Sequence, residues 1–407
     1  MKRRPDLTFK HNRKRGRYGW LRLTPAYSLK IVQRYLTNGQ TPVRVLDPFC
    51  GTGTTPLYAA YEGLEANALE LNPFLVWFAR VKTAAYDEYV VKELKEAGDE
   101  IVSRLDSNHA QLATPPPIRN IERWWSESAL TFLRGIKGEI EAYRHTTTSE
   151  EVIDLLYVCF CRTLIKISNA AFNHQSVSFS DNRQLSLFDE KDRYRSVFTR
   201  DVRFVADSAS ENPSTIPEIV QGDARNVADH IQYKADIVIT SPPYPNRMSY
   251  IRELRPYMYW LGYLEKAREA GELDWEAIGG TWGIATSRLS DWTRSEKEGY
   301  YPDYLQDILR RIGNDEHKNG EKMANYIARY FEDILQHFRN LIRVLNKGAV
   351  VHYVVGNSTF YGVLVPVERL YKEIMELVGL SPTNIEVVRK RNSKKELYEF
   401  AVSGRFL

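Results

Sequence analysis

The feature that most constrains the fold is a short apolar segment that runs into a glycine-containing loop and then into a helix-like segment. Residues 43–46 (VRVL) are strand-like, residues 47–55 read DPFCGTGTT, and a second strand-like segment, ANALE, follows at 66–70. The segments TPLYAAYEG and NPFLVWFARV, which follow the loop and the second strand, resemble helices. This order of strand, loop, helix and strand predicts a parallel sheet with helices on its faces.

The same alternation resumes towards the C-terminus. Strands are predicted at 218–220, 236–240, 348–355, 385–390 and 396–403, and helices near 323–345 and 365–378. The last two strands suggest an antiparallel pair at a sheet edge. The simplest architecture is therefore one α/β core that is interrupted by two insertions.

The insertions are blocks in which the alternation of strands and helices is lost. Residues 83–215 show helical spacing of apolar positions, apart from a loop at 113–117 and a polar stretch from Asn173 to about Asn212 that we expect to be a loop. The predicted organisation is 1–82, an N-terminal arm and the first part of the core; 83–215, a helical insertion; 216–249, core; 250–330, a helical and aromatic insertion; and 331–407, the C-terminal part of the core.

Positive charge is concentrated at the N-terminus. The formal net charge of the chain is only +4, but the first 20 residues hold eight lysines and arginines against a single acid, Asp6. Such a run is either a solvated tail or an arm that binds a polyanion.

The cysteine content argues for a reducing compartment. Cys50, Cys159 and Cys161 are too few for a disulfide framework and form no CxxC pair, so we expect no metal site. No segment has the length and apolarity of a membrane span, and no apolar segment follows the basic N-terminus. We therefore expect a cytoplasmic protein.

The loop after the first strand contains Gly51 and Gly53. Glycine allows close approach of the backbone to a ligand, and the N-terminus of the following helix favours electron-rich groups. A dinucleotide fingerprint would need a third glycine where this chain has Pro56, and the Gly-Lys-Ser/Thr of a P-loop is absent. A tight turn that serves packing alone is the alternative, but it does not account for Asp47 and Phe49.

Glu70 ends the second strand, in the sequence ELNP at 70–73. A carboxylate at the tip of this strand can accept hydrogen bonds from both hydroxyls of a ribose. A solvent-facing glutamate at a strand end is the alternative. The position of Glu70 relative to the glycine loop favours the ribose.

A second unusual strand end lies at 237–245, IVITSPPYP, where a strand runs straight into Ser241, Pro242, Pro243 and Tyr244. Proline has no N–H to donate and a fixed φ, so the chain must leave the sheet at once. By itself such a corner is also compatible with a rigid surface turn.

Taken together, these segments resemble the DNA amino-methyltransferases of restriction–modification systems, which use S-adenosylmethionine to methylate an exocyclic nitrogen. The resemblance is carried by DPFCGTGTT at 47–55, ELNP at 70–73, TSPPY at 240–244, WLRLTPAYSLKIVQRYL at 20–36 and GDAR at 222–225. It implies an α/β, Rossmann-like methyltransferase core, in which a mostly parallel sheet has an antiparallel edge strand, with two largely helical insertions.

Carried over residue by residue, the resemblance implies two adjoining sites. In the cofactor site, Phe49, Gly51 and Gly53 wrap the amino-acid part of S-adenosylmethionine above Asp47, Glu70 takes the ribose, Asp223 accepts from the adenine amine, and Thr24, Pro25 and Ser28 help close the methionine end; Thr54 and Asn72 stand in the same motifs and are included. In the base site, Ser241, the carbonyl of Pro242, Pro243 and Tyr244 form the pocket.

The chemistry of this family explains the two prolines. An exocyclic amine is a poor nucleophile because its lone pair is delocalised into the ring. Two acceptors at its two N–H groups, the Pro242 carbonyl and the Ser241 hydroxyl, can localise that lone pair, while Tyr244 stacks on the base. The protein then acts mainly by positioning and electrostatics. The base must be flipped out of a duplex or be single-stranded.

The identity of the methylated atom is less directly indicated. In the resembling family a serine at the first position of the turn goes with cytosine N4, and aspartate or asparagine with adenine N6, so we expect cytosine N4 and keep adenine N6 as the alternative. Methylation of cytosine carbon 5 needs a cysteine that follows a proline, and no cysteine here does. Further alternatives are a methyltransferase of an RNA base amine such as guanine N2, and an inactive DNA-binding module.

The long segment between Glu70 and Gly222 departs from the family, so two regions are candidates for DNA recognition. We expect 250–330 to contact DNA near the flipped base and 83–215 to supply grip. Arginines interleaved with aromatics suit a channel for bases and phosphates, with core packing as the alternative: Arg247, Arg252, Arg255, Tyr257, Tyr259, Trp260, Trp275, Trp282, Trp292 and Arg294.

One short peptide points to a protein partner. Residues Gln184–Phe188 (QLSLF) resemble the peptide by which bacterial proteins dock on the replication sliding clamp, with a chance match or local packing as the alternatives. The expected partners are therefore DNA, the sliding clamp and a cognate restriction endonuclease, in the nucleoid region of a prokaryotic cytoplasm.

Overall fold

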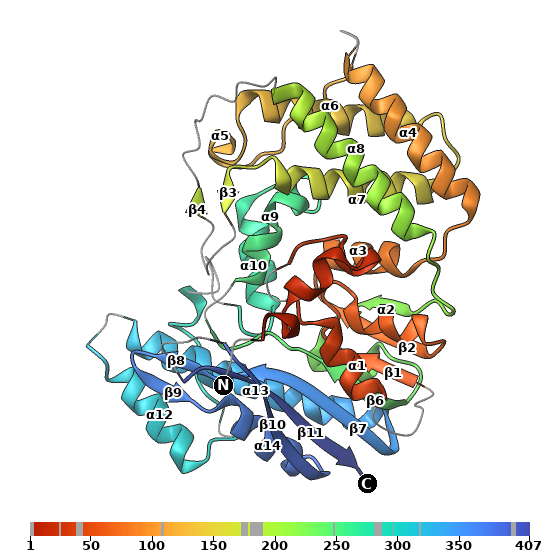
Figure 1. Ribbon diagram of the computed structural model, residues 1–407. Coiled ribbons are helices and arrows are strands. Elements are labelled where there is room, and N and C mark those ends of the chain that lie inside the picture. The colour runs from red at the N-terminus through yellow and green to blue at the C-terminus, as the bar shows by residue number, and fades with distance from the viewer. Residues whose placement is uncertain are drawn as a thin grey trace.

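The computed structural model describes residues 4–23, 26–37, 44–106, 110–171, 178–179, 190–246, 249–280, 287–295, 297–316, 319–391 and 396–407. A twisted sheet with flanking helices occupies the lower part of Figure 1, and a group of long helices occupies the upper part. Within the described ranges, no helix has both the length and the apolar character that crossing a membrane requires.

The sheet has seven strands in the order β10-β11-β7-β6-β1-β2-β5. Neighbours from β5 to β7 pair in parallel, whereas β11 pairs antiparallel with both β7 and β10. The predicted Rossmann-like class, with its antiparallel pair at one edge, is therefore confirmed. The strands are β1 (Arg44–Asp47), β2 (Glu65–Glu70), β5 (Glu218–Gln221), β6 (Ala235–Thr240), β7 (Leu345–Gly356), β10 (Leu380–Lys390) and β11 (Tyr398–Phe406).

The order of the strands reverses between β1 and β6. Counted along the chain, the first five strands of this sheet lie in the spatial order 3-2-1-4-5. In open α/β sheets, ligands bind beyond the carboxyl ends of the strands at such a switch point. Asp47 ends β1 and Thr240 ends β6, so the glycine loop and the SPPY turn leave the sheet from neighbouring strands.

Helices cover both faces of the sheet because alternate strand residues point to opposite sides. Val45, Ile237 and Ile239 pack against α1 (Leu29–Thr37) and α2 (Thr54–Tyr61). Leu46 and Val238 belong to a second core on the other face. That core includes α12 (Asp303–Gly313), α13 (Gly320–Leu341) and α14 (Val367–Leu377).

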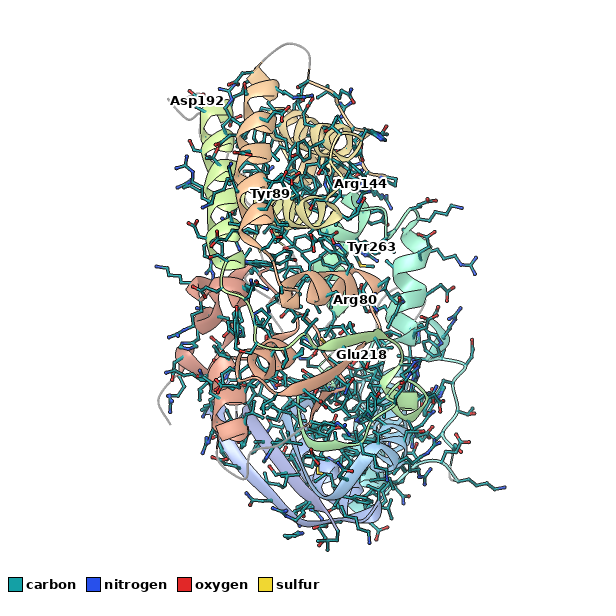
Figure 2. All side chains as sticks on the ribbon, turned by 90° about the vertical axis from the view of Figure 1, so that its right-hand side faces the viewer. Arg80, Tyr89, Arg144, Asp192, Glu218 and Tyr263 are labelled. Carbon is teal, nitrogen blue, oxygen red and sulfur yellow. The ribbon has the colours of Figure 1, made fainter. Side chains whose placement is uncertain are left out.

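The upper helices form a group with one continuous apolar core. They are α4 (Glu88–Asp106), α5 (Ile121–Trp124), α6 (Glu127–Arg144), α7 (Glu150–Lys166) and α8 (Glu190–Ala209). Leu94, Ile136 and Phe198 have no exposed surface in this core. Phe74 and Phe78 of α3 (Pro73–Thr83) join it, so α3 connects the group to the sheet. In Figure 2, Tyr89, Arg144 and Asp192 lie on the group, above Arg80 and Glu218 on the sheet part.

The expectation of a loop from Asn173 to about Asn212 is wrong from Glu190 onwards, where α8 runs for 20 residues. The buried residues of α8 recur at helical spacing, at Tyr194, Val197, Phe198, Val202, Val205, Ala206 and Ala209. Charged side chains fill the opposite face, so the polar composition concealed an amphipathic period.

The block at 250–330 divides between the two cores. Residues of α9 (Tyr250–Trp260) pack with the upper helices, and α10 (Ala267–Glu276) contacts α9, whereas α12 packs on the sheet. Tyr257, Tyr259 and Trp260 are buried, so core packing, not a channel, accounts for these three aromatics. Arg247 and Trp282 lie outside the described residues.

The basic N-terminus is not a solvated tail over residues 4–23. It forms three short helices, η1 (Pro5–Leu7), η2 (Phe9–Lys14) and η3 (Gly16–Gly19), and we call residues 4–23 the arm. In Figure 1 the arm is the dark red segment between the upper helices and the sheet part. The remaining short elements are β3 (Ala170–Ala171), β4 (Ser178–Phe179), η4 (Ala224–Asp229), η5 (Ile342–Val344), β8 (Ser358–Phe360) and β9 (Val363–Val365).

Candidate active site

The glycine loop is fixed from below by Asp47. This carboxylate is fully buried, and its Oδ1 accepts hydrogen bonds from the Thr240 hydroxyl at 2.5 Å and from the Phe49 N–H at 3.1 Å. Burial raises the pKa of Asp47 to about 6, although these hydrogen bonds act in the opposite direction. The Thr240 contact therefore ties the ends of β1 and β6 together beneath the loop.

The two glycines adopt backbone conformations that other residues rarely adopt. Gly51 has a φ of +54° and Gly53 a φ of +72°, both in the left-handed region. A Cβ on Gly51 would have no neighbour closer than the Phe49 carbonyl oxygen at 4.0 Å, so the loop backbone faces open space there. Gly53 is the N-cap of α2, and Thr54 is its first residue.

Lys82, which sequence reasoning missed, supports the loop from α3. Its buried ammonium group donates to the Thr52 carbonyl at 2.7 Å. Burial lowers the pKa of Lys82 to about 7. A lysine in the last turn of a predicted helix has no sequence signal for this role, because the contact depends on how α3 packs under the loop.

Glu70 joins the tip of β2 to the glycine loop. Its Oε2 accepts from the Gly51 N–H at 2.7 Å, and its Oε1 accepts from the Asn72 N–H at 2.9 Å. Burial raises the pKa of this carboxyl to about 7. The Asn72 side chain in turn caps α3 by accepting from the Phe74 N–H at 3.0 Å. Each Glu70 oxygen retains a lone pair for a further donor.

Asp223, after β5, is already engaged in an ion pair. Its carboxylate accepts from the Arg225 N–H at 2.9 Å and from the Arg225 guanidinium, with a shortest distance of 2.6 Å. Asp333 of α13 holds the same guanidinium at 3.0 Å. An adenine amine would therefore share the Asp223 carboxylate with Arg225.

The SPPY turn is held by hydrogen bonds that leave its two predicted acceptors available. The Ser241 hydroxyl donates to the Val354 carbonyl at 3.2 Å and lies 3.5 Å from the Tyr244 hydroxyl, which can donate to it, so one lone pair of Ser241 is left to accept. Tyr330 donates to the Pro243 carbonyl at 2.8 Å, and the Tyr244 N–H donates to the Tyr250 hydroxyl at 2.9 Å. Over the residues that the structure describes, no donor is hydrogen-bonded to the Pro242 carbonyl.

Tyr244 lies against Arg391 and Gly356, two residues that the sequence motifs did not indicate. The Arg391 guanidinium lies 5.3 Å from the centroid of the Tyr244 ring and donates to the Asn357 carbonyl at 2.9 Å. Both side chains occupy the space above Gly356, where a Cβ would stand 2.1 Å from Arg391 Nη1 and 2.9 Å from the tyrosine ring. Burial raises the pKa of Tyr244, which therefore stays a neutral phenol.

The glycine loop and the SPPY turn face one cavity of about 400 Å³. This volume falls within the range of small-molecule sites, about 300–1,000 Å³. The predicted site residues on its wall are Phe49, Gly51, Thr54, Glu70, Asn72, Asp223, Ser241, Pro242, Pro243 and Tyr244. The cavity thus brings together residues from four different strand ends.

Three of the predicted site residues that the structure describes, Ser28, Asp47 and Gly53, do not line this cavity. Asp47 and Gly53 lie behind the wall, as part of the loop. Ser28 is fully buried at the start of α1, where its hydroxyl donates to the Asp6 carbonyl at 2.7 Å. Thr24 and Pro25 lie outside the described residues.

Other wall residues were not expected from the motifs. Leu7, Thr8, Phe9 and Lys10 of the arm contribute to the wall, and so do Arg389 and Glu399 of β10 and β11, which form an ion pair. The sequence placed those two strands at a sheet edge. Only the strand order, with β11 next to β7, brings their ends close to the SPPY turn.

The wall residues suit S-adenosylmethionine. The open backbone at Gly51 can receive a flat or extended ligand, and the Glu70 carboxylate at the strand tip can accept from ribose hydroxyls. Beneath the loop, Asp47 Oδ2 is buried with no hydrogen-bond partner in the described part of the chain. Within the described residues, no cluster of three or more histidine, cysteine, aspartate or glutamate side chains could hold a metal ion.

Comparison with known proteins identifies methyltransferases as relatives. The chain is 22% identical to type II methyltransferase M.BsoBI of Geobacillus stearothermophilus, over 97% of this chain and 85% of that protein. It is 19% identical to type II methyltransferase M.MvaI of Kocuria varians, over 82% and 74% of the two chains. It is 20% identical to type II methyltransferase M.AvaI of Nostoc sp. strain PCC 7120, over 97% and 86%.

The predicted resemblance to methyltransferases of restriction–modification systems is therefore confirmed. No protein-family model matches the chain. Among solved structures, the rRNA methyltransferase aviRa from Streptomyces viridochromogenes covers 92% of this chain and 82% of its own at 12% identity, with a TM-score of 0.28. That score is too low to bear on fold or function.

Proposed function

We propose that this protein is a site-specific DNA methyltransferase that transfers the methyl group of S-adenosylmethionine to the exocyclic amine of a flipped base, cytosine N4. The proposal places it in a restriction–modification system or in another form of host DNA modification. It rests chiefly on one observation, the single cavity that joins the glycine loop to the Ser241–Tyr244 turn.

The cofactor end of the cavity is assigned to the residues around the two strand tips. Phe49 and Gly51 would contact the amino-acid part of S-adenosylmethionine, Glu70 the ribose and Asp223 the adenine. When bound, S-adenosylmethionine would supply a methyl group on a sulfonium, from which a neutral thioether departs as a good leaving group. The electron-rich floor of Asp47 and Glu70 suits a positively charged ligand.

The base end of the cavity is assigned to the turn. The Ser241 lone pairs and the Pro242 carbonyl accept the two N–H groups of the amine, so the nitrogen lone pair localises and turns out of the ring plane. Tyr330 holds the neighbouring Pro243 carbonyl, which fixes the direction of the Pro242 carbonyl. Once methylated, the nitrogen becomes strongly acidic and loses its proton to an acceptor without a strong general base. Orientation of this kind is worth on the order of 7–11 kcal/mol.

The choice of cytosine N4 depends on Ser241, the residue that accompanies this atom in the family that the motifs resemble. Adenine N6 is the second candidate at the same turn. Methylation of an RNA base amine is the third, and it is favoured less because that turn usually begins with asparagine or aspartate. The sulfonium chemistry and the cavity are the same in all three cases.

Several further assignments belong to the proposal. We assign DNA grip to residues 83–215 and contacts near the base to residues 250–330. A cognate restriction endonuclease and docking on the sliding clamp through Gln184–Phe188 remain separate proposals, and that peptide lies outside the described residues.

The proposal is tested by comparing methyl transfer to three kinds of nucleic acid. Purified protein is incubated with methyl-labelled S-adenosylmethionine and duplex DNA, single-stranded DNA or RNA. We expect label in duplex DNA, and loss of that label in a Pro242→Ala and Tyr244→Ala double variant that still folds by circular dichroism. Label in RNA alone would replace the proposed substrate, and label in none of the three would overturn the proposal.

A further inference from the structure

We infer that the arm is a preformed grip for the sugar–phosphate backbone of DNA beside the mouth of the cavity, and that Lys10, Arg13, Lys14 and Arg15 are its phosphate contacts. The inference rests on the proposed function, because it assumes that the substrate is DNA. It adds the location of a binding surface that none of the methyltransferase motifs includes.

The arm is mounted rigidly between the sheet part and the upper helices. The buried Asn12 side chain donates to the Tyr27 carbonyl at 3.0 Å and accepts from the Leu29 N–H at 2.9 Å. The fully buried Arg17 donates to the carbonyls of Lys82 at 3.2 Å and Ala209 at 2.6 Å, at the ends of α3 and α8. These contacts anchor η2 through Asn12 and η3 through Arg17.

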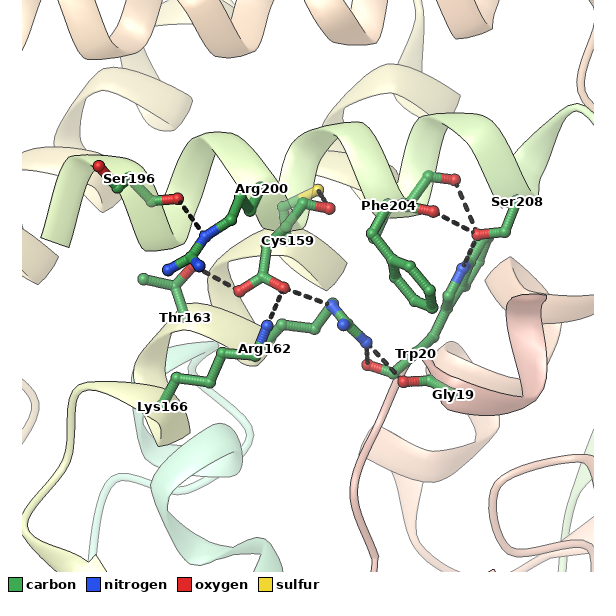
Figure 3. A network of polar contacts seen from close by, with 12 residues as sticks. Gly19, Trp20, Cys159, Arg162, Thr163, Lys166, Ser196, Arg200, Phe204 and Ser208 are labelled. Carbon is green, nitrogen blue, oxygen red and sulfur yellow. Dashed lines mark hydrogen bonds and ion pairs between the residues drawn. The ribbon is translucent and has the colours of Figure 1, made fainter. Parts of the chain in front are cut away.

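A second set of contacts joins the end of the arm to the upper helices. Figure 3 shows Arg162 of α7 between the arm and α8; it donates to the Trp20 carbonyl at 3.0 Å and to Asp201 Oδ1 at 2.8 Å. The Trp20 indole donates to the Ser208 hydroxyl at 2.6 Å. Because the arm is ordered before any ligand binds, little entropy is lost when it contacts one.

The charges that remain on the arm are exposed and uncompensated. Lys10, Arg13, Lys14 and Arg15 are all exposed. Asp6, the one acid within residues 4–23, pairs with Arg4 and with Lys30, and Glu211 lies beside Gly16. Across the described part of the chain, no ion pair involves any of the four, whereas basic residues of the upper helices such as Lys95 and Arg104 pair with acids.

The positive charge of Arg15 affects the ionisation of His11 in the same arm. Burial lowers the pKa of His11, and the positive charges of Arg15 and of Lys30 on α1 lower it further, while Asp6 acts in the opposite direction. Like charges held close together on a rigid support repel one another, and a polyanion relieves that repulsion while releasing its counterions. The pattern therefore fits a phosphate backbone better than a solvated face.

The position of the arm connects this charge to the reaction site. Thr8, Phe9 and Lys10 form part of the wall of the cavity that also holds Ser241 and Tyr244. A nucleotide that enters the cavity remains attached to its flanking phosphates, which stay near the mouth. Charges on η2 are then next to the backbone that must be distorted to extrude the base.

The test compares two variants that lose the same charge at different places. In the arm variant, Lys10→Gln, Arg13→Gln, Lys14→Gln and Arg15→Gln are combined. The control variant combines Lys234→Gln, Arg339→Gln, Arg343→Gln and Lys347→Gln, exposed residues near the amino ends of β6 and β7, away from the cavity. Affinity for duplex DNA is measured over a series of KCl concentrations, and thermal unfolding is measured for both variants.

Each phosphate contact contributes about 0.9 to the slope of log K against log salt concentration. We expect the slope of the arm variant to be shallower than that of the wild type by about 2 to 4, and the control to change by less than about 1. Equal slopes in the arm variant and the wild type would overturn the inference. Wild-type protein that binds and methylates RNA but not DNA would instead overturn the proposed function.

Discussion

The Ser241 hydroxyl donates to the Val354 carbonyl at 3.2 Å, across the boundary between β6 and β7. With its proton on this carbonyl, the oxygen can accept from the Tyr244 hydroxyl at 3.5 Å and keeps one lone pair for a ligand in the cavity that Ser241 lines. The serine at the head of the turn is thus oriented by the neighbouring strand.

Replacement of this serine is expected to impair the transfer step selectively. We expect Ser241→Ala to lower kcat by about 10²-fold, the magnitude typical for loss of one preorganised polar contact to the reacting group. The KM for S-adenosylmethionine should change little, because Ser241 lies at the base end. The control, Ser168→Ala, removes a hydroxyl that donates to the Ile165 carbonyl in the upper helices, and it should leave kcat intact. A larger effect on KM than on kcat would contradict this role.

Tyr330 offers a test of how the direction of the Pro242 carbonyl is set. Its hydroxyl donates to the Pro243 carbonyl at 2.8 Å and lies 2.7 Å from the Tyr371 hydroxyl, and Tyr330→Phe removes both contacts with a single oxygen. We expect kcat to fall about tenfold, since misaligned reacting groups lose much of the benefit of orientation. Tyr326→Phe is a matched control on the same helix, because its buried hydroxyl donates to the Gly279 carbonyl at 3.1 Å. Equal activity losses in the two variants would indicate general loosening of α13.

Gly356 is expected to be intolerant of any side chain. A Cβ there would lie 2.1 Å from Arg391 Nη1 and 2.9 Å from the Tyr244 ring, so both side chains must move. We expect Gly356→Ala to abolish most methylation while the dissociation constant for S-adenosylmethionine stays within about threefold of wild type. Gly313→Ala, whose Cβ would meet its nearest neighbour at 3.8 Å, is the control. Full activity in the Gly356 variant would remove Tyr244 from the base site.

The Glu70 carboxyl predicts a pH dependence of cofactor binding. Burial raises its pKa to about 7, so it gains charge as the pH rises from 6 to 8. An ionised carboxylate is the stronger acceptor for hydroxyl groups, so affinity for S-adenosylmethionine should increase over this range. Glu70→Gln should bind more weakly and show a flatter profile. Asp47, with a pKa of about 6, accounts for any change at the acidic end. An identical profile in the variant would contradict the assignment.

The same carboxyl predicts the opposite trend for stability without cofactor. Because its folded pKa lies above the ordinary value of 4.5, its stabilising contribution is fully present below pH 4.5 and is lost as the pH rises to 7. Relative to Glu70→Gln, the wild type should lose up to about 3 kcal/mol of unfolding free energy over that interval. Urea unfolding at pH 5 and pH 8 measures this difference.

The sequence was informative where one residue type performs one local task. Gly51 and Gly53 have positive φ, and two prolines follow β6. In each case the residue type alone indicates the backbone conformation. The strands that precede them could be predicted from short apolar runs for the same local reason. The antiparallel pair of β10 and β11 at the sheet edge was expected from the last two strands of the predicted series.

The parts that could not be predicted depend on contacts between distant segments. Lys82 and Tyr330 reach the loop and the turn only through the packing of α3 and α13, and Arg391 reaches Tyr244 only because β11 lies between β7 and β10. The helix α8 was missed because its charged face dominated its composition. In the arm, Arg17 looked like one more surface charge, but it is buried among backbone carbonyls.

The most direct measurement is the chemical identity of the methylated nucleoside. Duplex DNA is methylated by the purified protein, digested to nucleosides and analysed by mass spectrometry against standards. The account predicts N4-methylcytosine. N6-methyladenine would retain the cavity and the turn but refute the assignment to cytosine, whereas 5-methylcytosine would contradict the central claim that Ser241 and the Pro242 carbonyl present an exocyclic amine.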